Sequence, residues 1–131
     1  MVKFDLPMPP SVNAIYTPAL NRKTGHCYIR ESSACKSYKQ IVKMLLEPDL
    51  RSGNYTKFTS DVSIKVQFYF KQSKKNKKCD VDNRFKALLD SLVDAGILAD
   101  DTLVVHIEGD KIITQIIEKC VVEINSISDN S

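Results

Sequence analysis

The stretch that most constrains the fold runs from residue 61 to residue 101, where three patterns follow one another without a break. Apolar side chains occupy alternate positions from Val62 to Phe70, which predicts a strand with one buried face and one polar face. Residues 71–78 contain no apolar residue and predict a basic loop. An amphipathic helix is then predicted over residues 82–95. A half-buried strand followed so closely by an amphipathic helix favours a sheet with helices packed against it.

The predicted helix has one apolar stripe and a polar row at its margin. The stripe has the spacing i, i+3, i+4, i+7 and i+8, and consists of Phe85, Leu88, Leu89, Leu92 and Val93. Asp82 suits the N-cap or the first turn, and Gly96 suits the position just after the helix. At about 100° per residue, Asp82, Lys86 and Asp90 lie in a row along one margin of the stripe.

Charge is distributed unevenly along the same stretch. The loop holds five lysines, which are Lys71, Lys74, Lys75, Lys77 and Lys78. From Cys79 to Asp101 there are six aspartates against only Arg84 and Lys86, a net charge of −4. Like charges repel unless a cation lies among them, so the pattern indicates a divalent metal beside an anion-attracting loop.

The rest of the chain predicts a single α+β domain, 1–131, with a mixed sheet and two main helices. Strands are expected near residues 2–6, 62–70, 102–108 and 111–125, and helices over 33–47 and 82–95, with a frayed tail over 126–131. Ser32 or Ser33 suits the N-cap of the first helix, and Pro48 is expected to end it. Two arrangements remain open for the C-terminal strands: a hairpin turn at Gly109-Asp110, or a longer strand with a turn near Glu118-Lys119.

The predicted buried face of the first helix consists of Ala34, Tyr38, Ile41, Val42 and Leu45, with Lys36, Lys39 and Lys43 on the opposite side. Before this helix, residues 14–16 and 26–29 are expected to pair across a turn. Arg22, Lys23 and Arg30 make that segment basic, and such residues suit contact with a DNA backbone.

Several classes of protein are excluded. The start Asp80-Val81-Asp82-Asn83 resembles a calcium loop, but Phe85 stands where the EF-hand needs glycine. The four cysteines form no close pair, so neither a zinc site nor a redox dithiol is supported. No apolar run has the length of a membrane span, and we expect a cytoplasmic protein with reduced thiols.

The combination of motifs resembles the RusA family of Holliday junction resolvases, small phage and prophage endonucleases. The resemblance lies in Asp80-x-Asp82-Asn83-x-x-Lys86, in Leu89-Asp90 and Gly96, and in Asp100-Asp101. The opening Pro9-Pro10-Ser11-x-Asn13, with Tyr28 and Tyr38, also resembles that family.

The resemblance implies a homodimeric crossover junction endodeoxyribonuclease of DNA recombination and repair, which resolves four-way junctions by paired symmetric nicks. A two-fold dimer also fits the two equivalent strands of a junction. We expect Asp80, Asp82 and Asp101 to hold Mg²⁺, with Mn²⁺ as a substitute and Asp100 as the alternative third ligand. By analogy with the family, Lys86 completes the catalytic set by stabilising the developing charge or by positioning the scissile phosphate. The loop lysines, Asn13, Arg22, Lys23 and Arg30 are the expected DNA contacts.

Other functions fit parts of the same pattern. In a non-catalytic protein that binds branched DNA, the aspartates would be structural and the lysines would carry binding. A metal-dependent nuclease for flaps or other branched DNA would use the same acids. A phage structural module would have no role with nucleic acid. Metal-dependent cutting and salt-sensitive DNA binding distinguish these functions.

Overall fold

The computed structural model describes residues 1–10, 16–20, 22–71, 82–114 and 116–127 of the chain. Its elements, in order, are β1 (Val2–Leu6), β2 (Tyr16–Leu20), β3 (Cys27–Glu31), α1 (Ser33–Ser52), β4 (Val62–Lys71), α2 (Asp82–Ala95), the short 3₁₀ helix η3 (Asp101–Leu103), β5 (Val104–Thr114) and β6 (Lys119–Ser126). No helix in this described part of the chain combines the length and apolar character needed to cross a membrane.

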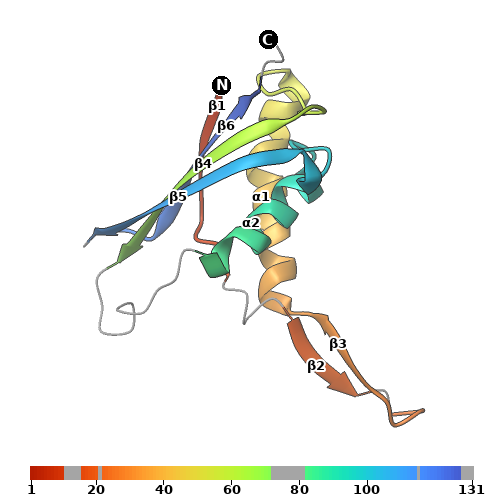
Figure 1. Ribbon diagram of the computed structural model, residues 1–131. Helices are drawn as coiled ribbons and strands as arrows, with labels where there is room; N and C mark the ends of the chain where they lie inside the picture. The colour runs from red at the N-terminus through yellow and green to blue at the C-terminus, as the bar shows by residue number, and fades with distance from the viewer. Residues whose placement is uncertain (11–15, 21, 72–81, 115, 128–131) are drawn as a thin grey trace.

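Four of the strands form one mixed sheet in the order β1-β6-β4-β5 (Figure 1). The strand β6 pairs antiparallel with both β1 and β4, whereas β4 and β5 are parallel. A parallel pair needs a crossover connection, and the segment containing α2 supplies it. The strands β2 and β3 form a separate antiparallel hairpin, which extends beyond the start of α1 and away from the sheet (Figure 1). The predicted α+β class with a mixed sheet and two main helices is confirmed.

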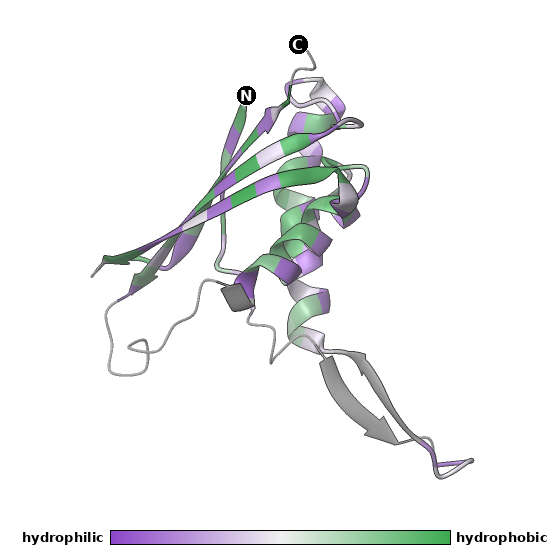
Figure 2. Cartoon of the chain, in the orientation of Figure 1, coloured by the Kyte–Doolittle hydropathy of each residue, from purple (hydrophilic) through white to green (hydrophobic). Residues whose placement is uncertain are grey.

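Both helices cover the same face of the sheet, and the core lies between them and the strands (Figure 1). Polar and apolar residues alternate along β4 (Figure 2), and its apolar side chains from Val62 to Phe70 are at most 1% exposed. Val42 and Leu46 of α1 are buried against them, as is Leu92 of α2. The alternation seen in the sequence therefore becomes the division between the helix-covered face and the open face.

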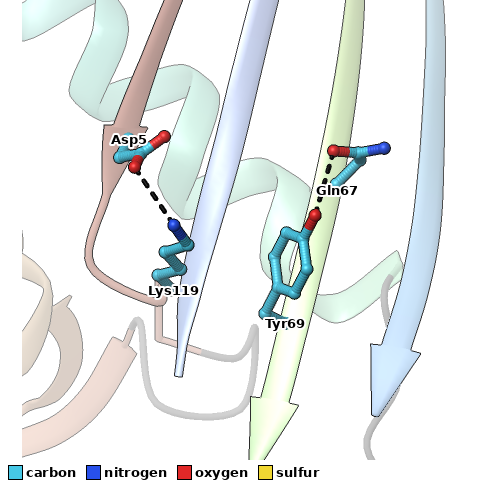
Figure 3. A network of polar contacts seen from close by, with 4 residues as sticks. All are labelled: Asp5, Gln67, Tyr69 and Lys119. Atoms are coloured by element: carbon cyan, nitrogen blue, oxygen red, sulfur yellow. Dashed lines mark hydrogen bonds and ion pairs between the residues drawn. The ribbon is translucent and has the colours of Figure 1, made fainter. Parts of the chain in front are cut away.

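The open face of the sheet is polar and ordered by charge. The strand register aligns Lys3, Glu123, Lys65 and Glu108 in one row across all four strands, so opposite charges are neighbours. Farther along, Lys119 Nζ lies 3.1 Å from Asp5 Oδ2, and the Tyr69 hydroxyl donates to Gln67 Oε1 at 3.3 Å (Figure 3). This face is adapted to water, as is common for a sheet covered on one side.

The first helix differs from its prediction at its end and in its buried face. Ser32 caps it as expected, its Oγ accepting from Cys35 N at 3.2 Å. The helix nevertheless continues through Pro48 to Ser52 and ends at Gly53, whose φ is 85°. The prediction that Pro48 ends it is wrong, because Leu46 and Leu50 on either side pack into the core and hold the last turns in place.

The buried stripe of α1 is also rotated relative to the prediction. Its buried residues are Cys35, Tyr38, Val42 and Leu46, whereas Ala34 is exposed, and Ile41 and Leu45 are 43% and 49% exposed. Tyr38 and Val42 are common to both sets. The rotation follows from the second neighbour of the helix, because α1 packs on α2 as well as on the sheet.

The C-terminal strands settle the alternative that the sequence left open. The strand β5 runs unbroken through Gly109-Asp110 to Thr114, so the hairpin turn at that point is excluded, and the longer strand is confirmed. Residues 101–103 form η3 in place of the expected start of a strand. The predicted frayed tail is wrong for its first two residues, since β6 includes Ser126 and Ile127 N donates to Asp61 O at 3.0 Å, and its remaining residues lie outside the described ones.

Candidate active site

The candidate site lies where α2 ends and the chain turns back along it. Gly96, with φ of 90°, allows Gly96 N to donate to Val93 O at 3.1 Å and Ile97 N to donate to Leu92 O at 3.3 Å. This pair of hydrogen bonds is a Schellman motif, in which a left-handed glycine closes the helix. Gly96 therefore has the role that the sequence predicted.

The turn after Gly96 is anchored to the body of the protein. Ile97 and Leu98 are fully buried, and Leu98 forms an isolated parallel bridge with Phe58. Phe58 N donates to Ile97 O at 2.9 Å, and Ala99 N donates to Phe58 O at 3.0 Å. These bonds leave little freedom for the next two residues, Asp100 and Asp101, which stand beside α2.

The two aspartates of this turn have different surroundings. Asp100 is the N-cap of η3, and its Oδ1 accepts from Thr102 N at 3.0 Å. This backbone hydrogen bond is the main cause that lowers the pKa of Asp100. The pKa of Asp101 is raised, first because its carboxyl is hydrogen-bonded to Asp100, and further by the negative charges of Asp100 and Asp90. The pair is therefore a concentration of negative charge that a cation would offset.

Lys86 and Asp90 extend this charged region along α2. Lys86 Nζ lies 3.7 Å from Asp90 Oδ2, one helical turn apart, and their side chains are 48% and 28% exposed. The positive charge of Lys86 also acts on Asp101 and partly offsets the rise in its pKa. The predicted polar row is thus confirmed for Lys86 and Asp90, and it faces the turn that carries Asp101.

An open hollow connects these groups with the other helix. Its charged lining residues are Lys39 of α1, Asp90 and Asp94 of α2, and Asp100 and Asp101 of the turn. Carboxylate oxygens are the donors that Mg²⁺ and Mn²⁺ prefer, and a divalent cation would offset the negative charges gathered around this hollow. The chemistry of the hollow therefore fits such an ion. Within the described residues, no group of three acidic, histidine or cysteine side chains is by itself arranged to hold a metal.

The predicted catalytic residues are only partly described. Lys86 lies close enough to Asp101 for its charge to affect that carboxyl, and Asp100 precedes Asp101 in the same turn. Asp82 is the first residue of α2, two turns before Asp90 along the same helix, but its side chain is not among the described ones. Asp80 lies outside the described residues.

The predicted DNA contacts fall in two places. Lys71 is exposed at the end of β4, whereas Lys74, Lys75, Lys77 and Lys78 lie outside the described residues, as does Asn13. Arg22 and Lys23 are exposed in the turn of the β2–β3 hairpin, away from α2 (Figure 1). The backbone of Arg30 lies in β3, and its side chain is not among the described ones.

Sequence reasoning did not place Lys39, Asp90 or Asp94 in the site. Asp90 had a signal, because it stands one turn after Lys86 in the polar row. Lys39 had none, since an exposed lysine row on α1 looks like any solvated helix face until α1 and α2 are packed together.

Comparison with known proteins identifies a family for the chain. The family model described as "Endodeoxyribonuclease RusA" matches residues 7–125, which is nearly the whole chain. The match includes every element from β2 to β5, and all of β6 except Ser126. A comparison with curated proteins gives no significant match.

Proposed function

Because the chain belongs to the RusA endodeoxyribonuclease family, we propose that it resolves four-way DNA junctions by metal-dependent hydrolysis of phosphodiester bonds. The observation that carries the proposal is the proximity of two pairs of residues. Lys86 and Asp90 lie on α2, the helix that begins at Asp82, and Asp100 and Asp101 lie in the turn beside it. Such a set of acids around one lysine suits phosphodiester hydrolysis, which needs a bound cation and a positive group near the phosphate.

In this proposal Asp80, Asp82 and Asp101 hold the Mg²⁺. The hydrogen bond from Thr102 N to Asp100 supports Asp101 rather than Asp100 as the third ligand, because it already engages one oxygen of Asp100. When bound, the ion would make water a stronger nucleophile and offset negative charge on the phosphate oxygens.

The proposed role of Lys86 is to stabilise negative charge that develops on the scissile phosphate. Its neighbour Asp90, 3.7 Å away, restricts where the ammonium group stands. With its side chain 48% exposed, Lys86 is also accessible to a strand of DNA. An ammonium on a flexible stem contacts phosphate as a point charge, which suits a site that reads no base.

Phosphate contacts outside the catalytic set would come from the two basic regions. Lys71 stands at the end of β4, and the lysines that follow it in the sequence precede the acidic helix. Arg22 and Lys23 stand on a hairpin that extends away from the sheet (Figure 1), where they would reach a separate part of a branched substrate. A homodimer would provide one site for each of two symmetric nicks.

The test uses a labelled synthetic four-way junction, a linear duplex and a flap of matched sequence. Wild type, Asp82→Asn and Asp110→Asn are each incubated with Mg²⁺ or chelator. Asp110 is an exposed acid of β5 and controls for the change in charge. We expect wild type and Asp110→Asn to place paired nicks in the junction only with Mg²⁺, and Asp82→Asn to bind it without cutting.

Three other outcomes separate the competing functions. Binding by all three proteins with no cutting in Mg²⁺ or Mn²⁺ would indicate a non-catalytic DNA-binding protein. Equal cutting of flap and junction would indicate a broader branched-DNA nuclease. Absence of salt-sensitive binding to any of the three DNAs would exclude a nucleic-acid function.

A further inference from the structure

Arg84 stands at the start of α2, two residues after Asp82 and two before Lys86, yet its side chain points into the protein. It is half-buried, and its contacts are with two segments distant in the sequence. Neither contact belongs to the acidic hollow described above, so the role of this residue has to be sought in what it joins.

The first contact is with the N-terminal proline segment. Arg84 Nη1 donates to the carbonyl oxygen of Pro9 at 2.7 Å, across 75 positions of sequence. The carbonyl of Pro7 is also held, accepting from the Tyr38 hydroxyl at 2.7 Å and from Cys120 Sγ at 3.6 Å. Proline has no N–H, so at Pro7 and Pro9 the carbonyl is the backbone group that can form a hydrogen bond. The segment precedes the β2–β3 hairpin in the sequence, and Arg84 ties it to α2.

The second contact is with the end of β4. The guanidinium carbon of Arg84 lies 5.7 Å from the centroid of the Phe70 ring, within the range of a cation–π interaction. Phe70 is 1% exposed and is followed by Lys71, the last residue of the strand and the first of the basic run. Arg84 therefore contacts the end of β4, where the basic run begins, and the proline segment, which precedes Asn13 and the basic hairpin in the sequence.

The environment of Arg84 is a poor one for stability alone. Its Nε is buried and has no hydrogen-bond partner among the described residues. Burying a guanidinium with one donor unsatisfied is unfavourable compared with an apolar side chain of similar length. The planar guanidinium of Arg84 does, however, bond to Pro9 at one end and pack on the Phe70 ring, and these two contacts fix the orientation of the segments that it joins.

We propose that Arg84 is a positioning residue, which locks the proline segment and the end of β4 at a set orientation to the first turns of α2. Asp82 and Lys86 lie in those turns, so their places relative to the flanking DNA-contacting segments depend on this lock. The inference rests on the proposed function, because it concerns the residues assigned there to metal and phosphate.

The test compares Arg84→Met, Arg84→Lys and the control Arg51→Met. Arg51 is a largely exposed arginine of α1 that forms an ion pair with Glu47, one turn earlier. Arg84→Met keeps an apolar stem over Phe70 but removes the hydrogen bond to Pro9. Arg84→Lys keeps a positive charge, and with it part of the contact with Phe70, but loses the planar fork.

Four quantities are measured for each protein: hydrogen exchange of α2, Mn²⁺ affinity by calorimetry, junction affinity in chelator, and single-turnover cleavage in Mg²⁺. For Arg84→Met we expect faster exchange in the first two turns of α2 and about tenfold weaker Mn²⁺ binding. We expect cleavage about 10–100-fold slower, as is typical when a group that orients ligands is lost. The junction affinity of Arg84→Met should change little. In the other three quantities Arg84→Lys should lie between Arg84→Met and wild type. Arg51→Met should match wild type in all four.

The inference is overturned if Arg84→Met shows wild-type exchange in the first turns of α2 and wild-type Mn²⁺ affinity. It is also overturned if cleavage falls only in proportion to the fraction of protein unfolded in urea, with unchanged metal dependence. Should Arg84→Met not fold, Arg84→Lys is judged by the same readouts. If wild type itself cuts no junction, the proposed function fails, while exchange and Mn²⁺ affinity still decide the role of Arg84.

Discussion

The two sides of α2 differ in what they contribute to the protein. On the side facing the sheet, Leu88 and Leu92 are fully buried in the core. On the side facing the 99–101 turn, Lys86 and Asp90 are partly exposed and stand near two further carboxylates. Fully burying a leucine side chain stabilises a fold by about 1.5–3 kcal/mol, whereas exposed acids placed together repel.

This contrast shows that stability and chemistry are separated on one helix. The packed side can be weakened without changing the charges of the site, and the acidic side can be neutralised without opening the core. Substitutions that change one side of α2 therefore test whether the function of the other side is affected.

The largest expected effect is on the acidic side. Asp101→Asn should lower single-turnover junction cleavage by about 10³-fold, because a proposed metal ligand is lost and metal catalysis supplies several kcal/mol. Its folded structure, followed by circular dichroism, should be unchanged.

Asp100→Asn sharpens this test, because an asparagine side-chain oxygen can still accept the hydrogen bond from Thr102 N. It should retain most of the cleavage that Asp101→Asn loses, and Asp110→Asn should retain all of it. If Asp100→Asn is the inactive variant of the three, the assignment of the third ligand to Asp101 is wrong.

On the packed side, Leu92→Ala should destabilise the protein by about 2–5 kcal/mol, because it leaves a cavity at a fully buried position. Urea unfolding measures the change. Cleavage by the folded protein, assayed well below the unfolding midpoint, should stay within a few-fold of wild type. A loss of cleavage as large as that of Asp101→Asn would mean that the two sides are not separable.

A smaller effect is expected where α1 holds the proline segment. Tyr38→Phe removes the 2.7 Å hydrogen bond to Pro7 O and should cost about 1 kcal/mol of unfolding free energy. Cys120 Sγ, at 3.6 Å, is the described donor that would remain for this carbonyl. A change below the error of urea unfolding would show that water or Cys120 replaces the hydroxyl fully.

Tyr38 also gives this prediction a pH dependence. Burial raises its pKa far above the ordinary value of 10.0, so the folded state keeps the proton that the unfolded chain releases. The resulting stability is fully present below pH 10.0 and is lost as pH rises above it. The difference between wild type and Tyr38→Phe should therefore shrink in alkaline solution, and a constant difference would contradict the role of burial.

The smallest expected effect is a gain in stability on the acidic side. The raised pKa of Asp101 means that ionising it disfavours the folded state, and the penalty sets in as pH rises from 3.8 through the raised value. Asp101→Asn should thus melt slightly above wild type at pH 7 without metal, and the difference should vanish below pH 3.8. Added Mg²⁺ should reverse the order by stabilising wild type alone.

The sequence predicted best those elements whose local pattern is strong. The strand β4 and the helix α2 have a strong hydrophobic period and, for α2, a capping signal at Gly96, so their positions follow from local pattern alone. Predicted helix 82–95 matches α2 residue for residue. These are also the elements that position the site.

Elements whose ends depend on packing were predicted less well. Pro48 is a helix-ending signal, but the burial of Leu46 and Leu50 carries α1 past it. In β5 the Gly109-Asp110 pair has the composition of a hairpin turn, yet pairing with β4 keeps the strand straight through it. In each case a contact distant in sequence outweighed a local preference.

The residues around the candidate site likewise fall into those that local sequence pattern associates and those that only packing brings together. Lys86, Asp90 and Asp101 could be associated from helix geometry and the short turn after Gly96. The contact between Arg84 and Pro9 could not, because it joins residues 75 positions apart and leaves no periodic signal. The proximity of Lys39 to these acids likewise required the packing of two helices.

The position of β6 in the sheet determines when the protein can fold during its synthesis. Among the described strands it comes last in the sequence, but it lies between β1 and β4 and pairs with both. Until it leaves the ribosome, the nascent chain carries two strands with unpaired edges, which are sites for association with other chains. No N-terminal fragment that lacks β6 contains a complete sheet, so the helices cannot be held in their final places before translation has passed this strand.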